Sequence, residues 1–145
     1  MKRSKEEAER WLKQAEFDLH SAKKNYEQKI YSYTCFLCEQ SAQKALKAYL
    51  FFKGERYVLE HSIKKLVENC SKFDAEFSLF EKHGAKLDKY YLSTRYPDAL
   101  PFPAIPYESY TEEDAQEAIK LASEILNFVK NKIEIKAGKC NNSLY

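Results

Sequence analysis

The sequence predicts an all-α, single-domain bundle of about five helices. Apolar residues recur three and four positions apart over several long segments, which is the period of a helix buried on one side. Three glycines and four prolines in 145 residues are too few for the tight turns of a β-rich fold. The length suits one domain that buries its core without metal or disulfide support. We expect a helical domain over residues 1–136 and a frayed polar tail over 137–145.

The first two helices are expected over residues 5–27 and 30–53. Ser4 and Glu7 have the spacing of a capping box at the start of the first helix. Its apolar residues keep the helical period: Trp11, Leu12, Ala15, Leu19, Ala22 and Tyr26. The second segment is apolar over most of its circumference, which is typical of a central helix in a bundle. Gly54 is expected to end it, because glycine readily takes the left-handed conformation of a helix C-terminus.

A third helix is expected over residues 61–73 and a fourth over 75–94, with Gly84 as a break or kink in the fourth. The buried side of the third helix is predicted from its apolar residues: Ile63, Leu66, Val67, Cys70 and Phe73. The four prolines, all within ten residues, exclude a regular helix over 95–110. Because this segment is also rich in aromatic residues, we expect an ordered strap packed down on the bundle. The last helix is expected over 111–134, opened by Thr111 with Asp114.

The four cysteines, Cys35, Cys38, Cys70 and Cys140, are expected to be free thiols in a reducing compartment. Cys35 and Cys38 have C-x-x-C spacing but lie inside an apolar helical run, without a second such pair to complete a zinc site. We interpret them as core residues and expect neither a metal nor a cofactor.

Charge and hydropathy exclude several classes of protein. A net charge of +2 rules out a strong global field for nucleic acid, although not a local basic patch. No apolar run approaches the roughly 20 residues that span a bilayer. Residues 1–7 contain no apolar stretch typical of a secretory signal, so we expect a cytoplasmic protein without a membrane partner. The sequence also contains no glycine-rich phosphate loop, nucleophile elbow or H-E-x-x-H motif.

Arg56 and His61 form the first polar grouping that could have a chemical role. The arginine could hold a phosphate through paired donors while the histidine moves a proton, which would allow phosphodiester cleavage without a metal. Such spacing often arises by chance, and the alternative is a histidine that caps the third helix beside a surface arginine.

Arg95 and Asp98 belong to the second grouping, Thr94-Arg95-Tyr96-Pro97-Asp98. Arg95 could contact a phosphate and Tyr96 a base. The alternative, which the residues alone favour, is an Arg95–Asp98 ion pair that pins the strap to the bundle.

The third grouping consists of Gln40, Gln43, Lys44 and Lys47 on the second helix, and we call it the polar stripe. Lys44 and Lys47 are three positions apart and therefore lie on one face. The stripe could line a phosphate-binding cavity, but such a stripe is more often the solvated side of a helix.

Four strings of this sequence resemble motifs of the HEPN domain family. They are Trp11-Leu12-Lys13-Gln14-Ala15-Glu16-Phe17-Asp18-Leu19, the run from Cys35 to Ala48, His61-Ser62-Ile63 with Leu66, and the run from Leu87 to Ala99. They occur in the family's order and cover about residues 9–130. The string from Thr94 to Pro106 is also similar to the HEPN domain that ends the large eukaryotic protein sacsin. Met1 and a complete bundle are more typical of a small stand-alone prokaryotic member.

The resemblance implies an up-and-down helical bundle that forms a homodimer, with part of the interface on the first two helices. Some members of the family are metal-independent ribonuclease toxins neutralised by a minimal nucleotidyltransferase. In such an enzyme Arg56 would stabilise the scissile phosphate and His61 would act as acid and base. Other members, including the sacsin type, resemble nucleotide-binding modules.

We expect the second kind: a homodimeric module, accessory to a nucleotidyltransferase-type partner, that binds a nucleotide or an RNA phosphate. The expected contacts are Lys44, Lys47, Arg95 and Asp98, with Arg56 and His61 nearby. The ribonuclease toxin is the first alternative. A dimerisation module without a ligand is the second.

Overall fold

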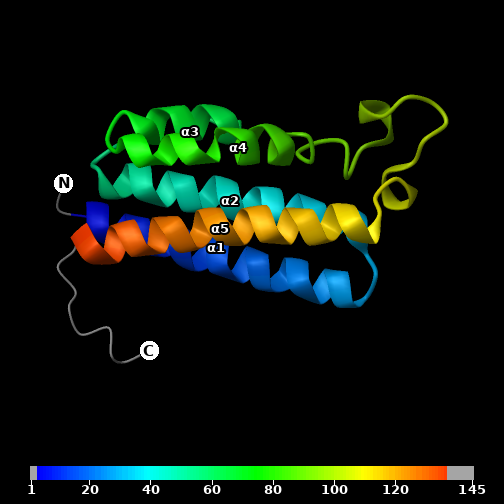
Figure 1. The fold of residues 1–145 in the computed structure, drawn as a ribbon, viewed down its shortest axis with the longest axis horizontal. Helices are drawn as coiled ribbons and strands as arrows, with labels where there is room; N and C mark the ends of the chain where they lie inside the picture. The colour runs from blue at the N-terminus through cyan, green and yellow to red at the C-terminus, as the bar shows by residue number, and fades with distance from the viewer. Residues whose placement is uncertain (1–2, 137–145) are drawn as a thin grey trace.

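The computed structural model describes residues 3–136 as a bundle of five α-helices with three short 3-10 turns, and it contains no strand in that range (Figure 1). The α-helices are α1 (Ser4–Glu27), α2 (Tyr31–Phe52), α3 (Ile63–Ser71), α4 (Glu81–Asp88) and α5 (Glu112–Lys136). The 3-10 turns are η1 (Ala75–Phe80), η2 (Pro97–Ala99) and η3 (Pro106–Glu108). The all-α fold predicted from the sequence is confirmed.

Helix α2 is the central element of the bundle. It lies between the short α3–α4 pair on one side and the long helices α1 and α5 on the other (Figure 1). Its core residues include Ala42, Leu46 and Tyr49, each fully buried. Because neighbours surround it, α2 can be apolar over most of its circumference, as its sequence predicts.

Helices α3 and α4 are shorter than their predicted segments. Helix α3 begins at Ile63 because Ser62 is its N-cap: the hydroxyl of Ser62 accepts a hydrogen bond from the backbone N–H of Lys65 at 3.2 Å. The predicted fourth helix divides into η1 and α4, and α4 ends at Asp88. The carboxylate of Asp88 then accepts hydrogen bonds from the backbone N–H groups of Ile63 and Lys64, at 2.6 and 3.2 Å.

Gly84 neither breaks nor kinks α4, contrary to the expectation from the sequence. It is buried in the middle of the helix, where a Cβ atom would lie 2.9 Å from both Cα and N of Lys64. Glycine is therefore required because the backbones of α3 and α4 approach one another closely. This approach brings the end of α4 against the start of α3, beside His61.

The two predicted capping boxes have different outcomes. Thr111 and Asp114 bond reciprocally at the start of α5, with N···O distances of 2.9 and 3.1 Å, as predicted. The Ser4–Glu7 box does not form, because Ser4 is already the first helical residue and Arg3 provides no side-chain cap. The Glu7 carboxylate instead accepts from the Arg10 guanidinium and the Trp11 indole, at 2.7 and 3.1 Å.

The strap over 95–110 is non-helical apart from η2 and η3, as the prolines require. Its expected packing on the bundle is wrong for the middle of the segment. Pro106 is buried, and Tyr110 packs edge-on against Tyr90 at 5.7 Å, but Phe102 is 97 % exposed. Phe73, predicted on the buried side of the third helix, is also partly exposed at 44 %.

Cys35, Cys38 and Cys70 are free and fully buried, which confirms their prediction as core residues. Burial raises the pKa of all three thiols, that of Cys35 to about 12, so they stay protonated and inert at neutral pH. Cys140 lies outside the described residues. No helix in residues 3–136 combines the length and apolarity needed to cross a membrane.

We predict that Gly84→Ala destabilises the fold even though alanine is the better helix former by about 1 kcal/mol. The added methyl group must displace the backbone of α3 at Lys64, and overpacking of this kind costs roughly 1–3 kcal/mol. Urea unfolding of both proteins measures the difference. Ala85→Gly, at the exposed next position, is the control for propensity alone. An unchanged or raised stability for Gly84→Ala would contradict the close approach.

Candidate functional site

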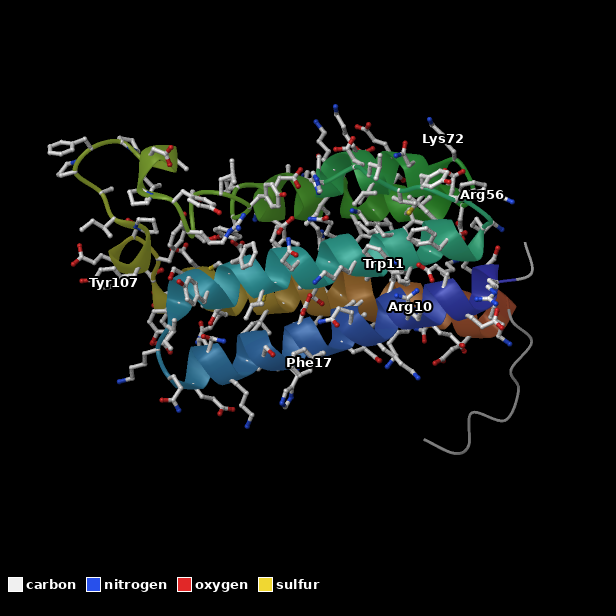
Figure 2. All side chains as sticks on the ribbon, turned by 180° about the vertical axis from the view of Figure 1, so that it is seen from behind. Arg10, Trp11, Phe17, Arg56, Lys72 and Tyr107 are labelled. Atoms are coloured by element: carbon white, nitrogen blue, oxygen red, sulfur yellow. The ribbon has the colours of Figure 1, made fainter. Side chains whose placement is uncertain are left out.

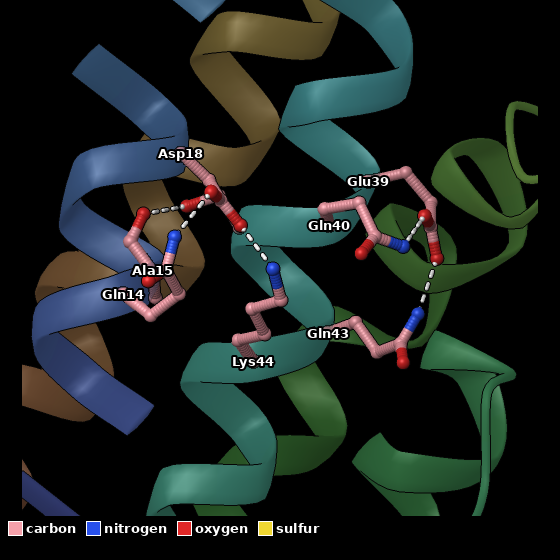
Figure 3. Close-up of polar contacts among 8 residues, drawn as sticks. Gln14, Ala15, Asp18, Glu39, Gln40, Gln43 and Lys44 are labelled. Carbon is pink, nitrogen blue, oxygen red and sulfur yellow. Dashed lines mark hydrogen bonds and ion pairs between the residues drawn. The ribbon is translucent and has the colours of Figure 1, made fainter. Parts of the chain in front are cut away.

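The polar stripe of α2 is not a solvated helix face, so that alternative from the sequence is wrong. Gln43 and Lys47 are each only 5 % exposed, and Lys44 is in an ion pair. Figure 3 shows the stripe dividing in two directions, with Lys44 reaching toward α1 and Gln43 turned toward Glu39. Each direction has its own polar partners.

Lys44 joins α2 to α1. Its Nζ lies 2.6 Å from a carboxylate oxygen of Asp18, and the other oxygen accepts a 3.0 Å hydrogen bond from Gln14 (Figure 3). Asp18 is only 5 % exposed, so these two contacts supply partners to a carboxylate that meets little water. The positive charge of Lys44 is therefore already matched within the protein.

Lys47 has no such partner. Its Nζ lies 5.5 Å above the ring of Trp11, and within residues 3–136 it makes no hydrogen bond or ion pair. In the same range Tyr49 Oη is the one side-chain polar atom that is both fully buried and without a partner. Nζ of Lys47 also lacks a partner, so it is not fully buried and still reaches solvent. Burial lowers the pKa of Lys47, while the charges of Glu39 and Glu60 oppose this shift.

Glu39 is a fully buried carboxylate on the other side of the stripe. Its two oxygens accept hydrogen bonds from the side-chain amides of Gln40 and Gln43, at 2.9 and 2.8 Å (Figure 3). It has no ion pair in the described part of the chain. Burial raises its pKa to about 7, although the two amide hydrogen bonds partly offset the shift.

His61 lies beside Gln43. Its Nδ1 is 3.4 Å from Gln43 Oε1, and its ring stacks on Tyr91 with centroids 5.4 Å apart and an interplanar angle of 18°. His61 does not cap α3, because Ser62 does so, and this alternative from the sequence is wrong. The residue as a whole is exposed to solvent.

Arg95 contacts Tyr91, the residue on which His61 stacks. Its Cζ is 4.1 Å from the ring centroid of Phe36 and 5.4 Å from that of Tyr91, and its Nε donates to the Tyr91 carbonyl at 3.1 Å. In the described range Arg95 makes no ion pair with Asp98, so the proposed pin between strap and bundle is absent. We call Glu39, Gln43, His61, Tyr91 and Arg95 together the α2–α4 cluster.

The N-terminus of α3 is not an open anion site. The Glu60 carboxylate accepts from the backbone N–H groups of His61 and Ser62, each at 3.0 Å, and these bonds lower its pKa. Asp88 occupies the next backbone donors. An anionic ligand near His61 would therefore have to be held by side chains.

Arg56 lies in different surroundings from His61. It lines a pocket of about 270 Å³ at the far end of α2, together with Arg3, Ser4, Glu7, Phe51, Glu55 and Tyr57. Figure 2 places Arg56 at the end of the bundle opposite Tyr107 of the strap. Phe51 beside Arg56 and Gln43 beside His61 are eight positions apart on α2, which is about 12 Å along the helix.

Asp98 lines a second pocket, of about 350 Å³, with Leu92, Tyr96 and Ala99. The Tyr96 ring is 5.0 Å from Cζ of Arg95, so this pocket adjoins the α2–α4 cluster. The Tyr96 ring could stack on a flat polar ring, and the Asp98 carboxylate would repel a phosphate, so this pocket favours a base over a phosphate.

The sequence analysis missed Glu39 and Asp18. Both are acidic residues at positions that the helical period assigns to the buried side, and that conflict was the available signal. Within residues 3–136 no group of three or more His, Cys, Asp or Glu side chains could hold a metal ion.

Comparisons with known proteins bear on the family and the fold. The family model described as "HEPN domain" matches residues 8–132. Human sacsin is 29 % identical over 138 residues, which span 88 % of this chain and 3 % of sacsin. A Methanocaldococcus jannaschii protein named "Putative toxin MJ1304" is 29 % identical over 140 residues, covering 90 % of this chain and 91 % of that protein.

Two crystal structures share the fold. That of TT1696 from Thermus thermophilus has a TM-score of 0.81 and 35 % identity, covering 91 % of this chain and 99 % of the other. That of ST0689, described as an archaeal HEPN homologue, has a TM-score of 0.71 and 41 % identity, covering 87 % and 97 %. The resemblance found in the sequence is confirmed.

We predict that Glu39 makes the fold less stable as pH rises. Its folded pKa of about 7 lies above the ordinary value of 4.5, so ionisation opposes folding. Stability is full below pH 4.5 and falls by roughly 3 kcal/mol as pH rises to 7. Urea unfolding at pH 5 and pH 8 should show this loss in the wild type and not in Glu39→Gln. An equal loss in both proteins would assign it to other groups.

Proposed function

We propose that this chain, which belongs to the HEPN domain family, binds the phosphate of a nucleotide or of RNA as a homodimer. In this proposal Lys47, Arg95 and His61 contact the ligand at separate points, because Lys47 and the Phe36 ring under Arg95 are eleven positions apart on α2, about 16 Å along the helix. The protein is then a non-catalytic partner of a nucleotidyltransferase-type system. A ribonuclease toxin and a module without a ligand are the alternatives.

The state of Lys47 is the observation that carries the proposal. An ammonium group on a residue 5 % exposed, without a hydrogen bond or ion pair in the described residues, has lost part of its hydration without gaining an anion. A bound phosphate would supply that anion. The Trp11 ring beneath it offers only a modest cation–π contact.

The other expected contacts have supporting roles. Lys44 is neutralised by Asp18, so we assign it to placing α1 against α2 and not to a direct contact with the ligand. Asp98 would repel a phosphate, and we assign it to the base or sugar, because it lines the pocket formed with Tyr96.

Exposed apolar side chains on α1 and α2 support the homodimer. Phe17 on α1 is 61 % exposed and Tyr33 on α2 is 52 % exposed. Large apolar side chains of this kind often lie in protein interfaces. We therefore propose that α1 and α2 supply part of the dimer contact.

We predict that Lys47→Met and Arg95→Gln each weaken the binding of ADP and of pyrophosphate by about tenfold or more, because each removes a charged contact to phosphate. Asp98→Asn should weaken the binding of ADP without weakening that of pyrophosphate. Isothermal titration calorimetry at low and high salt measures these affinities, and the wild-type affinity should fall as salt rises.

Lys86→Met is the matched control, because Lys86 is an exposed lysine that already pairs with Glu117. It should bind like the wild type. Wild-type protein that binds neither probe would favour the module without a ligand. Equal losses in Lys47→Met and Lys86→Met would contradict the assigned site. Light scattering on the same samples tests the dimer, and a monomer at tens of micromolar would overturn that part.

The ribonuclease alternative is supported by the relative named "Putative toxin MJ1304" and by the exposure of His61. Because Arg56 and His61 have separate surroundings in one protomer, such an enzyme would need Arg56 of one copy beside His61 of the other. Such a cross-interface pair again requires the dimer.

We predict that the purified protein does not cleave RNA in excess EDTA, even at high protein concentration. Cleavage that survives EDTA and is abolished in His61→Ala would replace the binding proposal with the ribonuclease. Cleavage that persists in His61→Ala would indicate a contaminating nuclease.

A further inference from the structure

The side-chain amide of Gln43 has its two ends fixed by its neighbours. On one side lies the Glu39 carboxylate, which is ionised above its pKa of about 7 and can then only accept hydrogen bonds. The NH₂ end of Gln43 must therefore face Glu39, where it donates to a carboxylate oxygen at 2.8 Å. The opposite orientation would place two acceptors against one another inside the protein.

This orientation decides what His61 meets. The remaining end of the amide is the carbonyl oxygen, Oε1, which lies 3.4 Å from Nδ1 of His61. A carbonyl oxygen also only accepts, so Nδ1 has to carry the hydrogen. In a neutral imidazole the other nitrogen, Nε2, then has the lone pair, and it has no partner among residues 3–136.

We propose that Glu39 is a positioning residue that, acting through Gln43, holds His61 in the Nδ1–H tautomer and leaves Nε2 as a hydrogen-bond acceptor. The tautomer follows from the side chains of Glu39, Gln43 and His61 and requires no ligand. Its use for a ligand hydroxyl, such as that of a ribose, rests on the proposed function.

The surrounding contacts make the connection rigid. Gln40 donates to the other oxygen of Glu39 at 2.9 Å, so the carboxylate is held from both sides. Glu39 and Gln43 are four positions apart on α2, which keeps their side chains on adjacent turns. The stack on Tyr91 restricts rotation of the His61 ring. Through these contacts the position of the buried Glu39 carboxylate determines which group of Gln43 faces the imidazole of His61.

The charged groups around Glu39 set the conditions for a test. Asp88 opposes its ionisation, whereas Arg95 favours it. Lys47 lies within electrostatic reach. At pH 8.5 the carboxylate is ionised, since this is above its pKa of about 7, and an imidazole is ordinarily neutral.

The experiment is ¹⁵N NMR of the His61 ring in the free protein at pH 8.5, where long-range ¹H–¹⁵N correlations distinguish the two nitrogens. The wild type should show a protonated Nδ1 and an unprotonated Nε2. Glu39→Met removes the acceptor while keeping a similar shape, so the amide is free to turn. The population should then move toward the Nε2–H form that predominates in isolated histidine.

Two further variants keep the test decisive. Gln43→Met breaks the bridge itself and should give the same change, which covers the case in which Glu39→Met fails to fold. Gln40→Met removes the other donor to Glu39 but not the path to His61, so its tautomer should match the wild type.

An Nε2–H tautomer in the wild type, or no change in a folded Glu39→Met or Gln43→Met, would overturn the proposal. A change of the same size in Gln40→Met would also overturn it, because the effect would then be general loosening. Since the measurement uses no ligand, its result is separate from whether the protein binds phosphate.

Discussion

The structure depends on the central position of α2. A helix with neighbours on several sides has little surface left for water, so every polar group on it must find a partner within the protein. Most of α2 meets this condition by being apolar. The small residues Thr34 and Ser41 donate to backbone carbonyls of α1. Four longer polar side chains also need partners, and these are Glu39, Gln43, Lys44 and Lys47.

Three of the four are satisfied inside the protein. Lys44 pairs with Asp18, and this partly buried ion pair joins α1 to α2 at one point along their length. Glu39 and Gln43 bond to one another, and the chain continues to His61 at the start of α3. Lys47 is left over. Polar side chains of this one helix therefore join it to neighbours on both sides and leave one cation without an anionic partner. The residues that stabilise the fold and the residue proposed to bind the ligand are close neighbours on α2.

The helices could be predicted from the sequence because their signal is local. The apolar period fixed the existence and approximate ends of α1, α2 and α5, and Thr111 with Asp114 marked a true helix start. The errors arose where partners distant in sequence decide the outcome. Gly84 resembled a helix break until Lys64 of α3 was seen against it, and the aromatic strap was expected to pack although Phe102 projects into solvent.

The candidate site divides in the same way. Residue types and spacing selected Lys47 as part of the polar stripe, Arg95 as part of Thr94–Asp98, and His61 for its distance in sequence from Arg56. All three remain candidates for the proposed site. Sequence could not show that Asp18 neutralises Lys44, or that Arg95 packs on Phe36 without pairing with Asp98. Those facts depend on pairings between helices, and one chain contains no direct record of them.

The separation of Arg56 from His61 limits what one protomer can do. A phosphodiester being cleaved needs a cation on its oxygens and a proton carrier within hydrogen-bond reach of one reacting atom. Arg95 and His61 both contact Tyr91, whereas Arg56 lines a pocket with Phe51, which is about two helical turns along α2 from Gln43. Arg95 can hold a phosphate, and in the tautomer proposed for His61 Nε2 can accept from a hydroxyl. A site with these parts is suited to holding a nucleotide. To cut RNA with Arg56, it must receive that arginine from a second copy.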